Sequence, residues 1–346
     1  MSNNVIKNND EIIAKKSKNL LERIPTKKNR KQVENALEFS IKMHHGQTRK
    51  SGLPFVSHCI DVANILIDWN MDHTTVVSAL LHDVVEDTEV KLSDIEEEFG
   101  SDVALLVDGV TKVENIAFRS KKHKQAENFT KLFLSLARDL RVIIIKFADR
   151  LNNMETIQYL SSKKRKEIAL ETKEIFVPLA HRLGMAQLKW KLEDLSLKCL
   201  DLRAFNGIKK KIETSSRLNE DILSNAIKPI KSELNTYKIK SNIFGRYKSI
   251  SSIHRKIEKS GKKFEEIYDL YAIRIVVDKI EECYLALGVI HSIYPPIQDR
   301  FKDFIATPKT NGYQSIHTTV LTKDNRLTEF QIRTKDMDYT AEVGVA

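Results

Sequence analysis

The spacing of apolar residues changes once along the chain, and this change constrains the fold more than any other feature. Up to about residue 200, apolar residues recur every three or four positions, which is the period of an amphipathic helix. Three later segments, residues 271–277, 316–321 and 328–333, are β-branched or alternating runs bounded by turn residues, as is typical of strands. The sequence therefore predicts a multidomain protein, in which an all-α domain precedes an α+β domain.

The chain of 346 residues is long enough for two domains, each with its own core. We expect a loosely helical leader over residues 1–27, in which little chemistry is placed, and the all-α domain over residues 28–200. A Lys- and Glu-rich amphipathic stretch over residues 201–240 predicts a helical connector. The α+β domain then occupies residues 241–346.

The charge of the chain favours anionic partners. Lys and Arg outnumber Asp and Glu by 57 to 47, a net charge of +10, so nucleotides, nucleic acid and anionic membranes all remain open. No apolar run approaches the roughly 18 residues of a membrane span, and the polar N-terminus does not resemble a signal peptide, so we expect a cytoplasmic protein without membrane partners. The three dispersed cysteines predict reduced, buried thiols.

The segment 74–87 concentrates potential metal ligands. Read as one helix, it places a histidine and three carboxylates on one arc of roughly 140°: His82, Asp83, Glu86 and Asp87. Ala79 lies within this arc and leaves space for an ion or a phosphate. An adjacent His-Asp pair can bind a divalent metal, although other segments must complete the coordination.

Two residues elsewhere are candidates for the missing ligands. His58 follows Ser57, a plausible helix N-cap, so its ring is expected near a helix start. Asp149 shares a helix face with Lys146 and Asn153 in an otherwise apolar segment. The alternative is that the His-Asp pair is incidental and that Asp149 forms a structural ion pair with a basic neighbour.

Three long motifs of this half, residues 45–58, 80–88 and 147–156, closely resemble the HD hydrolase domain of the long RelA/SpoT stringent-response enzymes. The resemblance implies one metal ion, usually Mn²⁺, bound by His58, His82, Asp83 and Asp149. It implies that Glu86 and Asp87 manage the attacking water. It also implies that Arg49, Lys50 and Asn153 hold the guanosine tetra- or pentaphosphate alarmone, (p)ppGpp. Two departures from the family pattern, Cys59 and Asn152, remove no implied ligand.

Two acidic residues mark a second candidate site in the α+β half. Asp269 immediately precedes the strand at 271–277, and Glu329 lies in the strand at 328–333. If these strands are neighbours, the two carboxylates can converge on one Mg²⁺, as suits phosphoryl-type transfer. The alternative is that Glu329 and Arg333 form the solvated side of a half-buried strand.

Basic residues surround the same segments. Arg246, Lys248, Arg255 and Lys256 flank a predicted loop-to-helix entry, where amides and cations can bind phosphates. Arg300, Lys302 and Lys309 precede the turn at Gly312 and Tyr313. This turn is expected to expose the tyrosine ring for stacking on a base.

The segments 245–257, 269–275, 308–317 and 329–334 match the synthetase domain of the same family. The resemblance implies a nucleotidyltransferase-like fold that transfers pyrophosphate from ATP to the 3′-hydroxyl of GDP or GTP. It implies Mg²⁺ binding by Asp269, a base or second metal ligand in Glu329, and guanine stacking on Tyr313. The implied phosphate contacts are Arg246, Lys248, Lys302, Lys309 and His317. The basic stretch 300–303 resembles that of bifunctional members.

The sequence therefore indicates a bifunctional (p)ppGpp synthetase and hydrolase with ATP, GDP or GTP, and (p)ppGpp as partners. The chain resembles the catalytic region of a longer enzyme, so no ribosome contact is expected from it. Three alternatives stay open: one activity predominates, the chain binds RNA through its positive charge, or it binds nucleotides as a regulator without catalysis.

Overall fold

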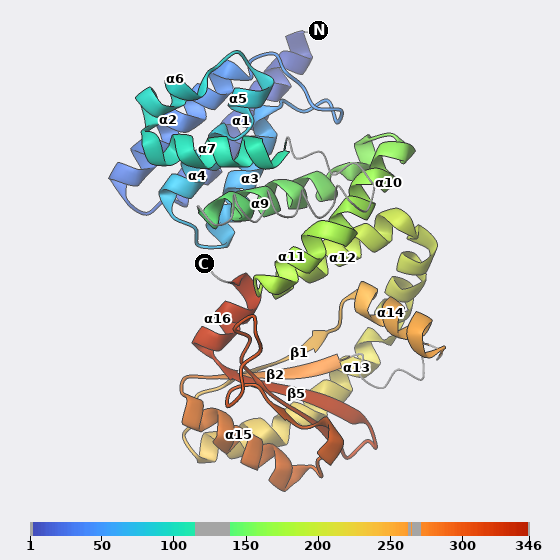
Figure 1. The fold of residues 1–346 in the computed structure, drawn as a ribbon. Coiled ribbons are helices and arrows are strands. Elements are labelled where there is room, and N and C mark those ends of the chain that lie inside the picture. The colour runs from blue at the N-terminus through green and yellow to red at the C-terminus, as the bar shows by residue number, and fades with distance from the viewer. Residues whose placement is uncertain (1–2, 115–138, 262–263, 265–270, 345–346) are drawn as a thin grey trace. The chain divides into compact units, whose positions relative to one another are not determined.

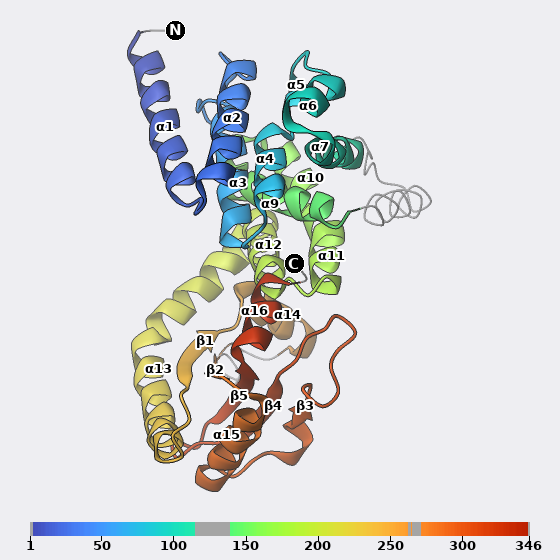
Figure 2. The same cartoon turned by 90° about the vertical axis from the view of Figure 1, so that its left-hand side faces the viewer.

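The computed structural model describes residues 3–114, 139–261, 264 and 271–344 (Figures 1 and 2). The chain divides into two compact units, residues 1–165 and 166–346. The first unit is built from helices and the second combines helices with a five-stranded sheet. The predicted order, an all-α part followed by an α+β part, is confirmed.

The first unit packs its helices around α3, α4 and α9. Its elements are α1 (Asn3–Glu22), α2 (Lys27–Met43), α3 (Val56–Asp68), α4 (His73–Leu81), α5 (Val84–Asp87), α6 (Leu92–Phe99), α7 (Ser101–Glu114), α9 (Arg141–Glu155) and the 3₁₀ helix Ile157–Tyr159. Ile60 of α3, Leu80 of α4 and Phe147 of α9 are fully buried. These helices therefore form a rigid base for the side chains they carry.

The predicted leader is helical over most of its length and belongs to this unit. Helix α1 extends over most of it, and its Leu20 is fully buried. Lys16 Nζ lies 2.6 Å from Asp61 Oδ1, and Arg23 pairs with Asp68, both partners belonging to α3. Although the segment is polar in composition, it buries Leu20 and is attached to α3 by these ion pairs.

The segment 74–87 was expected to form one helix, but it forms two. Helix α4 ends at Leu81, His82 and Asp83 form a turn, and α5 begins at Val84. The His82 Nδ1 atom lies 2.7 Å from the carbonyl oxygen of Ala79, the group that the backbone N–H of Asp83 would use in an unbroken helix. The imidazole thus takes the carbonyl oxygen that the backbone N–H of Asp83 would need for the helix to continue.

The second unit contains the sheet in the order β1-β2-β5-β4-β3. Its strands are β1 (Asn242–Tyr247), β2 (Tyr271–Val277), β3 (Lys302–Asp303), β4 (Ile316–Leu321) and β5 (Leu327–Thr334). Strands β2 and β5 pair in parallel, and the other neighbours are antiparallel. The three predicted strands are confirmed as β2, β4 and β5.

The sequence did not predict β1 or β3. Strand β1 has no buried alternating face, and Gly245 interrupts its pattern. The structure gives a reason for this glycine, because a Cβ at the position would lie 2.6 Å from Leu223 Cδ1. Strand β3 is only two residues long, too short for any periodic signal.

Helices make up most of the remaining described segments of this unit. They are α10 (Ser162–Glu171), the π-helical turn Thr172–Phe176, α11 (Val177–Arg182), α12 (Ala186–Leu200), α13 (Leu202–Thr236), α14 (Ile250–Ser260), α15 (Ile280–Ile293), the 3₁₀ helix Gln298–Arg300 and α16 (Lys335–Val343). Ile230 of α13 and Ile290 of α15 share one core with Ile273 and Phe330 of the sheet. Figures 1 and 2 show α13 and α15 lying along the strands.

The predicted connector is therefore helical, and the end of α13 also belongs to the core of the second unit. The predicted end of the all-α domain at residue 200 stays a prediction. The two compact units of the structure divide between residues 165 and 166. Among the described residues, no helix is long and apolar enough to cross a membrane. Cys59 and Cys283 are buried as expected, whereas Cys199 is half-buried.

We expect Leu20→Ala to lower the free energy of unfolding of the first unit by about 2–5 kcal/mol, because a fully buried leucine leaves a cavity. The matched control is Leu105→Ala on α7, a leucine that is 48% exposed. Urea unfolding midpoints measure both. Equal midpoints for the two variants would show that α1 does not stabilise the unit.

Candidate active sites

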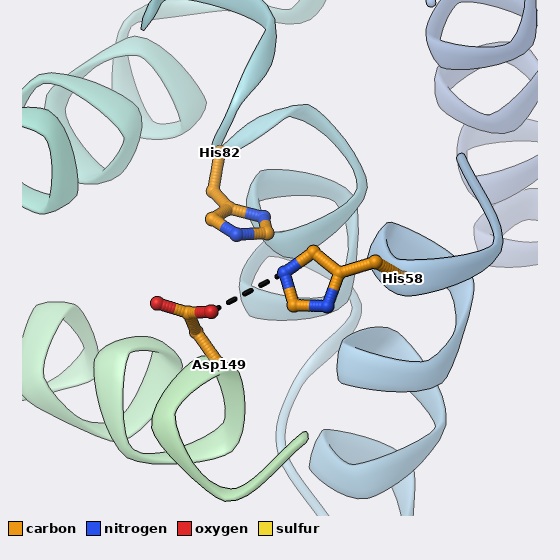
Figure 3. A group of neighbouring side chains, drawn as sticks. All are labelled: His58, His82 and Asp149. Atoms are coloured by element: carbon orange, nitrogen blue, oxygen red, sulfur yellow. Dashed lines mark ion pairs between the residues drawn. The ribbon is translucent and has the colours of Figure 1, made fainter. Parts of the chain in front are cut away.

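In the first unit, helices α3 and α9 and the turn after α4 bring four predicted ligands together. Figure 3 shows three of them, His58, His82 and Asp149. His58 Nε2 lies 3.2 Å from Asp149 Oδ1 and 3.6 Å from Asp83 Oδ2. His82 Nε2 lies 3.0 Å from Asp83 Oδ1. One ligand atom each of His58, His82 and Asp149 fits within 4.8 Å, and all three side chains are buried.

Hydrogen bonds fix how both imidazoles face this cluster. His82 Nδ1 lies 2.7 Å from the Ala79 carbonyl oxygen, and His58 Nδ1 lies 2.7 Å from Asn152 Oδ1. Both partners are acceptors, so each Nδ1 carries a proton and donates. In the neutral rings this leaves the lone pairs on Nε2, the atoms that face the carboxylates.

The cluster fits a divalent metal ion. His82 Nε2 is buried and makes no hydrogen bond, although it lies close to Asp83. Lone pairs of two imidazoles and two carboxylates repel one another unless a cation lies among them. Burial alone would raise the pKa of Asp149, but the Lys146 ammonium holds it well below its usual range. The carboxylate is thus ionised, as a metal ligand must be.

The helix start at His58 differs in detail from the prediction. His58 is in the first turn of α3, as expected, but Phe55 occupies the N-cap position without a side-chain bond. Ser57 is not the cap, because its Oγ donates to the Pro54 carbonyl oxygen at 2.7 Å. His58 is therefore positioned by α3 and by Asn152.

Two of the predicted alarmone contacts adjoin the metal cluster. Arg49 Nη2 lies 2.5 Å from Asn153 Oδ1, and Asn153 Nδ2 lies 2.5 Å from Asp149 Oδ1. Lys50, by contrast, is exposed, and no bond brings it to the cluster. An anion beside the cluster would therefore meet Arg49 and Asn153 first.

The predicted water-managing residues lie on α5, immediately after the ligand turn. Glu86 and Asp87 are exposed, and the backbone N–H of Asp87 donates to the Asp83 carbonyl oxygen at 2.8 Å. Gln47 Nε2 donates to the Asp87 carbonyl oxygen at 2.9 Å, which ties the loop before α3 to α5. Both carboxylates are thus held one helical turn from a ligand.

Asn152 is a site residue whose role the sequence analysis missed. Its Oδ1 accepts from His58 Nδ1 and, at 3.2 Å, from Arg49 Nη1. It therefore connects a metal-ligand candidate to a phosphate-binding candidate. Its position three residues after Asp149, on the same helix face, was a signal that could have identified it.

The second candidate site is centred on Glu329 in β5. Its carboxylate lies 3.2 Å from Lys248 Nζ and 3.4 Å from His317 Nδ1, and accepts from Gln331 Nε2 at 2.8 Å. Burial would raise the pKa of Glu329, but His317, Lys248 and Gln331 lower it well below its usual range. The side chain is only 19% exposed, so Glu329 is not a solvated strand residue.

The predicted magnesium pair is described only in part. Asp269 lies outside the described residues. The convergence of Asp269 and Glu329 was predicted on the condition that their strands are neighbours. That condition holds, because β2 and β5 pair in parallel with Ala272 opposite Glu329.

Tyr313 and two predicted phosphate contacts lie close to His317. The Tyr313 hydroxyl lies 2.8 Å from His317 Nε2. The ring was expected to be exposed, but it is half-buried. Lys309 Nζ lies 4.9 Å from the centre of this ring. Burial lowers the pKa of Lys309, and Lys302 lowers it further; Lys302 is paired with His317 across β3 and β4. Cations therefore gather beside the ring.

A cavity of about 370 Å³ opens next to Arg246. It is lined among others by Trp190, Arg274 and Glu342. Arg246 Nη1 lies 3.2 Å from Glu342 Oε1, and Arg274 Nη1 lies 2.5 Å from the same oxygen. Arg333 is fully buried and pairs with Asp338 at 2.9 Å. Arg246 thus lies beside a cavity, as part of a cluster of charged residues that the sequence did not indicate: Arg274, Arg333, Asp338 and Glu342.

Two protein families match separate parts of the chain. Residues 36–186 match the HD domain family, and residues 245–346 match the region found in RelA / SpoT proteins. The chain thus carries an HD domain followed by the region found in RelA / SpoT proteins.

Relatives agree with this pair of domains. The chain is 43% identical over 317 residues to the guanosine-3′,5′-bis(diphosphate) 3′-pyrophosphohydrolase of Spiroplasma citri, covering 91% of this chain and 42% of that protein. It is 43% identical over 303 residues to the bifunctional (p)ppGpp synthase/hydrolase SpoT of Escherichia coli, covering 88% of this chain and 43% of that protein. The chain therefore spans less than half the length of these relatives. It belongs to the RelA/SpoT family.

A solved structure, described as a metazoan ortholog of SpoT that hydrolyzes ppGpp, is also similar. It is 30% identical, with a TM-score of 0.40, and the similarity covers 49% of this chain and 94% of that one.

We expect Asn152→Leu to weaken Mn²⁺ binding by about 10–100-fold, because His58 loses the acceptor that fixes its ring and tautomer. The matched control is Asn64→Leu on α3, whose Nδ2 donates to the Ile60 carbonyl oxygen. Calorimetric titration of the metal-free chain with Mn²⁺ measures the affinities. An unchanged affinity in Asn152→Leu would contradict the positioning role.

Proposed function

We propose that the chain is a bifunctional alarmone enzyme. One unit hydrolyses the 3′-pyrophosphate of (p)ppGpp to give GDP or GTP and pyrophosphate. The other transfers pyrophosphate from ATP to the 3′-hydroxyl of GDP or GTP and releases AMP. The names of the two relatives support both reactions, and the cytoplasm is the compartment we propose from the sequence. One activity predominating in this chain is the alternative.

The convergence of His58, His82, Asp83 and Asp149 is the observation that carries the proposal for hydrolysis. Mn²⁺, the ion that the resemblance implies, would lower the pKa of a bound water and neutralise pyrophosphate oxygens.

The surrounding side chains then have distinct tasks. Arg49 and Asn153 bind and orient the phosphates next to the cluster. Glu86 or Asp87 takes the proton of the attacking water. The bond between phosphorus and the 3′-oxygen breaks as the new bond to phosphorus forms, and the 3′-oxygen takes up the proton that the carboxylate accepted, which yields GDP or GTP and pyrophosphate.

For synthesis, the carrying observation is the ionised Glu329 between Lys248 and His317. Glu329 either accepts the proton of the ribose 3′-hydroxyl or, together with Asp269, holds Mg²⁺, which supplies charge neutralisation at the transferred phosphates. We assign the phosphates to Arg246, Lys248, Lys302, Lys309 and His317. We assign guanine stacking to Tyr313, whose half-buried ring lies close to these cations.

Two incubations of the purified chain test the proposal. ATP plus GDP with Mg²⁺ should yield ppGpp and AMP, and ppGpp with Mn²⁺ should yield GDP and pyrophosphate, both read by chromatography. Product in one incubation only would favour the alternative of a predominant activity. Nucleotide binding without product in either would favour a regulator without catalysis, and binding of RNA alone would favour an RNA-binding protein.

Asp83→Ala should abolish hydrolysis, because loss of one charged ligand strongly weakens the metal site of the first unit. The rate of synthesis should change by less than about twofold, because Glu329 and its neighbours lie in the second unit. Asp61→Ala, which removes an ion-pair partner of Lys16 on α3, is the matched control and should retain both activities. Equal loss of both activities in folded Asp83→Ala would argue against two separate sites.

Glu329→Gln should lower synthesis by at least about 100-fold in kcat and leave hydrolysis intact. The amide is nearly isosteric but cannot accept the 3′-proton or neutralise a metal ion, and the loss of a positioned base typically costs 10²–10⁴-fold. Glu281→Gln, an exposed residue at the start of α15, is the matched control. Near-normal synthesis by Glu329→Gln would make Glu329 a structural residue only.

A further inference from the structure

Trp190 contacts a predicted substrate residue from outside both matched regions. It lies in α12, after the HD match ends at residue 186 and before the RelA/SpoT match begins at residue 245. The Cζ atom of Arg246 is 3.7 Å from the centroid of the Trp190 ring. At this distance the planar guanidinium stacks on the indole face and is attracted to its π electrons.

One face of α12 is shaped to meet the second site. Gln187, Trp190 and Asp194 follow one another at three- and four-residue steps, so they share that face. Gln187 and Trp190 line the cavity beside Arg246. The Asp194 carboxylate accepts the backbone N–H of Ser251 at 2.8 Å and thereby caps the start of α14. The face thus supports both the cavity and the phosphate-binding loop before α14.

Arg246 needs such support because its surroundings are strained by charge. Its pKa is lowered to about 10, mainly by burial; Glu342 raises it, and Arg274 and Arg333 contribute to the lowering. Glu342 also binds Arg274, so three guanidinium groups share its carboxylate. The indole face adds an attraction that carries no charge of its own and limits the rotamers of Arg246.

We propose that Trp190 is a positioning residue of the synthesis site: it holds Arg246 against α12 in the orientation that binds the phosphates of ATP. The inference rests on the proposed synthesis reaction. A guanidinium fixed before the nucleotide arrives loses less conformational freedom on binding, so the contact should act mainly on affinity and less on turnover.

Kinetics of two variants separate positioning from mere packing. Trp190→Leu keeps an apolar side chain but removes the ring, and should raise the KM for ATP about tenfold while kcat changes less than threefold. Trp190→Phe keeps an aromatic face and should recover most of the affinity. A KM equal to that of the unmodified chain in Trp190→Leu, or equal KM increases in both variants, would overturn the proposal.

Fluorescence reports on the same contact without turnover. The chain has two tryptophans, so Trp69→Phe leaves Trp190 as the only one. Titration with ATP should then change the emission and saturate near the KM. Trp190→Phe, in which Trp69 reports, is the matched control and should show no change.

The two measurements distinguish failure of the inference from failure of the proposed function. If synthesis proceeds and the emission of Trp190 does not respond to saturating ATP, Trp190 does not position Arg246, and the proposed function stands. If no synthesis occurs under any condition, the proposed function fails. The fluorescence titration then decides by itself whether ATP binds against Trp190.

Discussion

Both candidate sites depend on charged groups that are buried and must be neutralised where they lie. Moving an ionised side chain from water into a protein interior costs several kcal/mol unless opposite charges or donors are within reach. In the first unit, Asp149 is balanced by Lys146 at 2.8 Å, yet the imidazole lone pairs beside it call for a further cation. A cluster of this kind is costly as a structural device and useful as a metal site.

The second unit solves the opposite problem, an excess of buried positive charge. Arg274 in β2 and Arg333 in β5 project from parallel neighbouring strands, and α16 supplies Asp338 and Glu342 against them. These ion pairs connect α16 to the two central strands. Because Glu342 also reaches Arg246 in β1, one carboxylate links β1 and β2 at the edge of the cavity.

The parts of the fold that the sequence predicted are those whose burial follows a simple period. Strand β2 was predicted because it is buried almost throughout, as expected for a strand in parallel pairing. Strand β1 was missed because its pattern is set by contacts with α13, where Gly245 makes room for Leu223. Helix α1 was underestimated because the ion pairs that attach it to α3 involve residues more than forty positions away. Tertiary partners, which no local window contains, decided these elements.

The same reasoning explains which site residues the sequence could indicate. Groups with recognisable motifs, such as His82 and Glu329, were predicted and lie within bonding distance of other predicted residues. Asn152 could have been found from its helix face, and Arg274 from its place as a charge within the apolar run 271–277.

Trp190 carried no such signal, because a tryptophan in an amphipathic helix is ordinarily a core residue. Its contact with Arg246 of β1 is a tertiary one, formed within the unit in which α12 also packs against α14 and α16. Gln187 and Trp190 follow the matched HD region in sequence, yet their side chains line the cavity beside Arg246. The limits of a catalytic unit are therefore set by the side chains that hold its charges, and α12 belongs with the sheet that it supports.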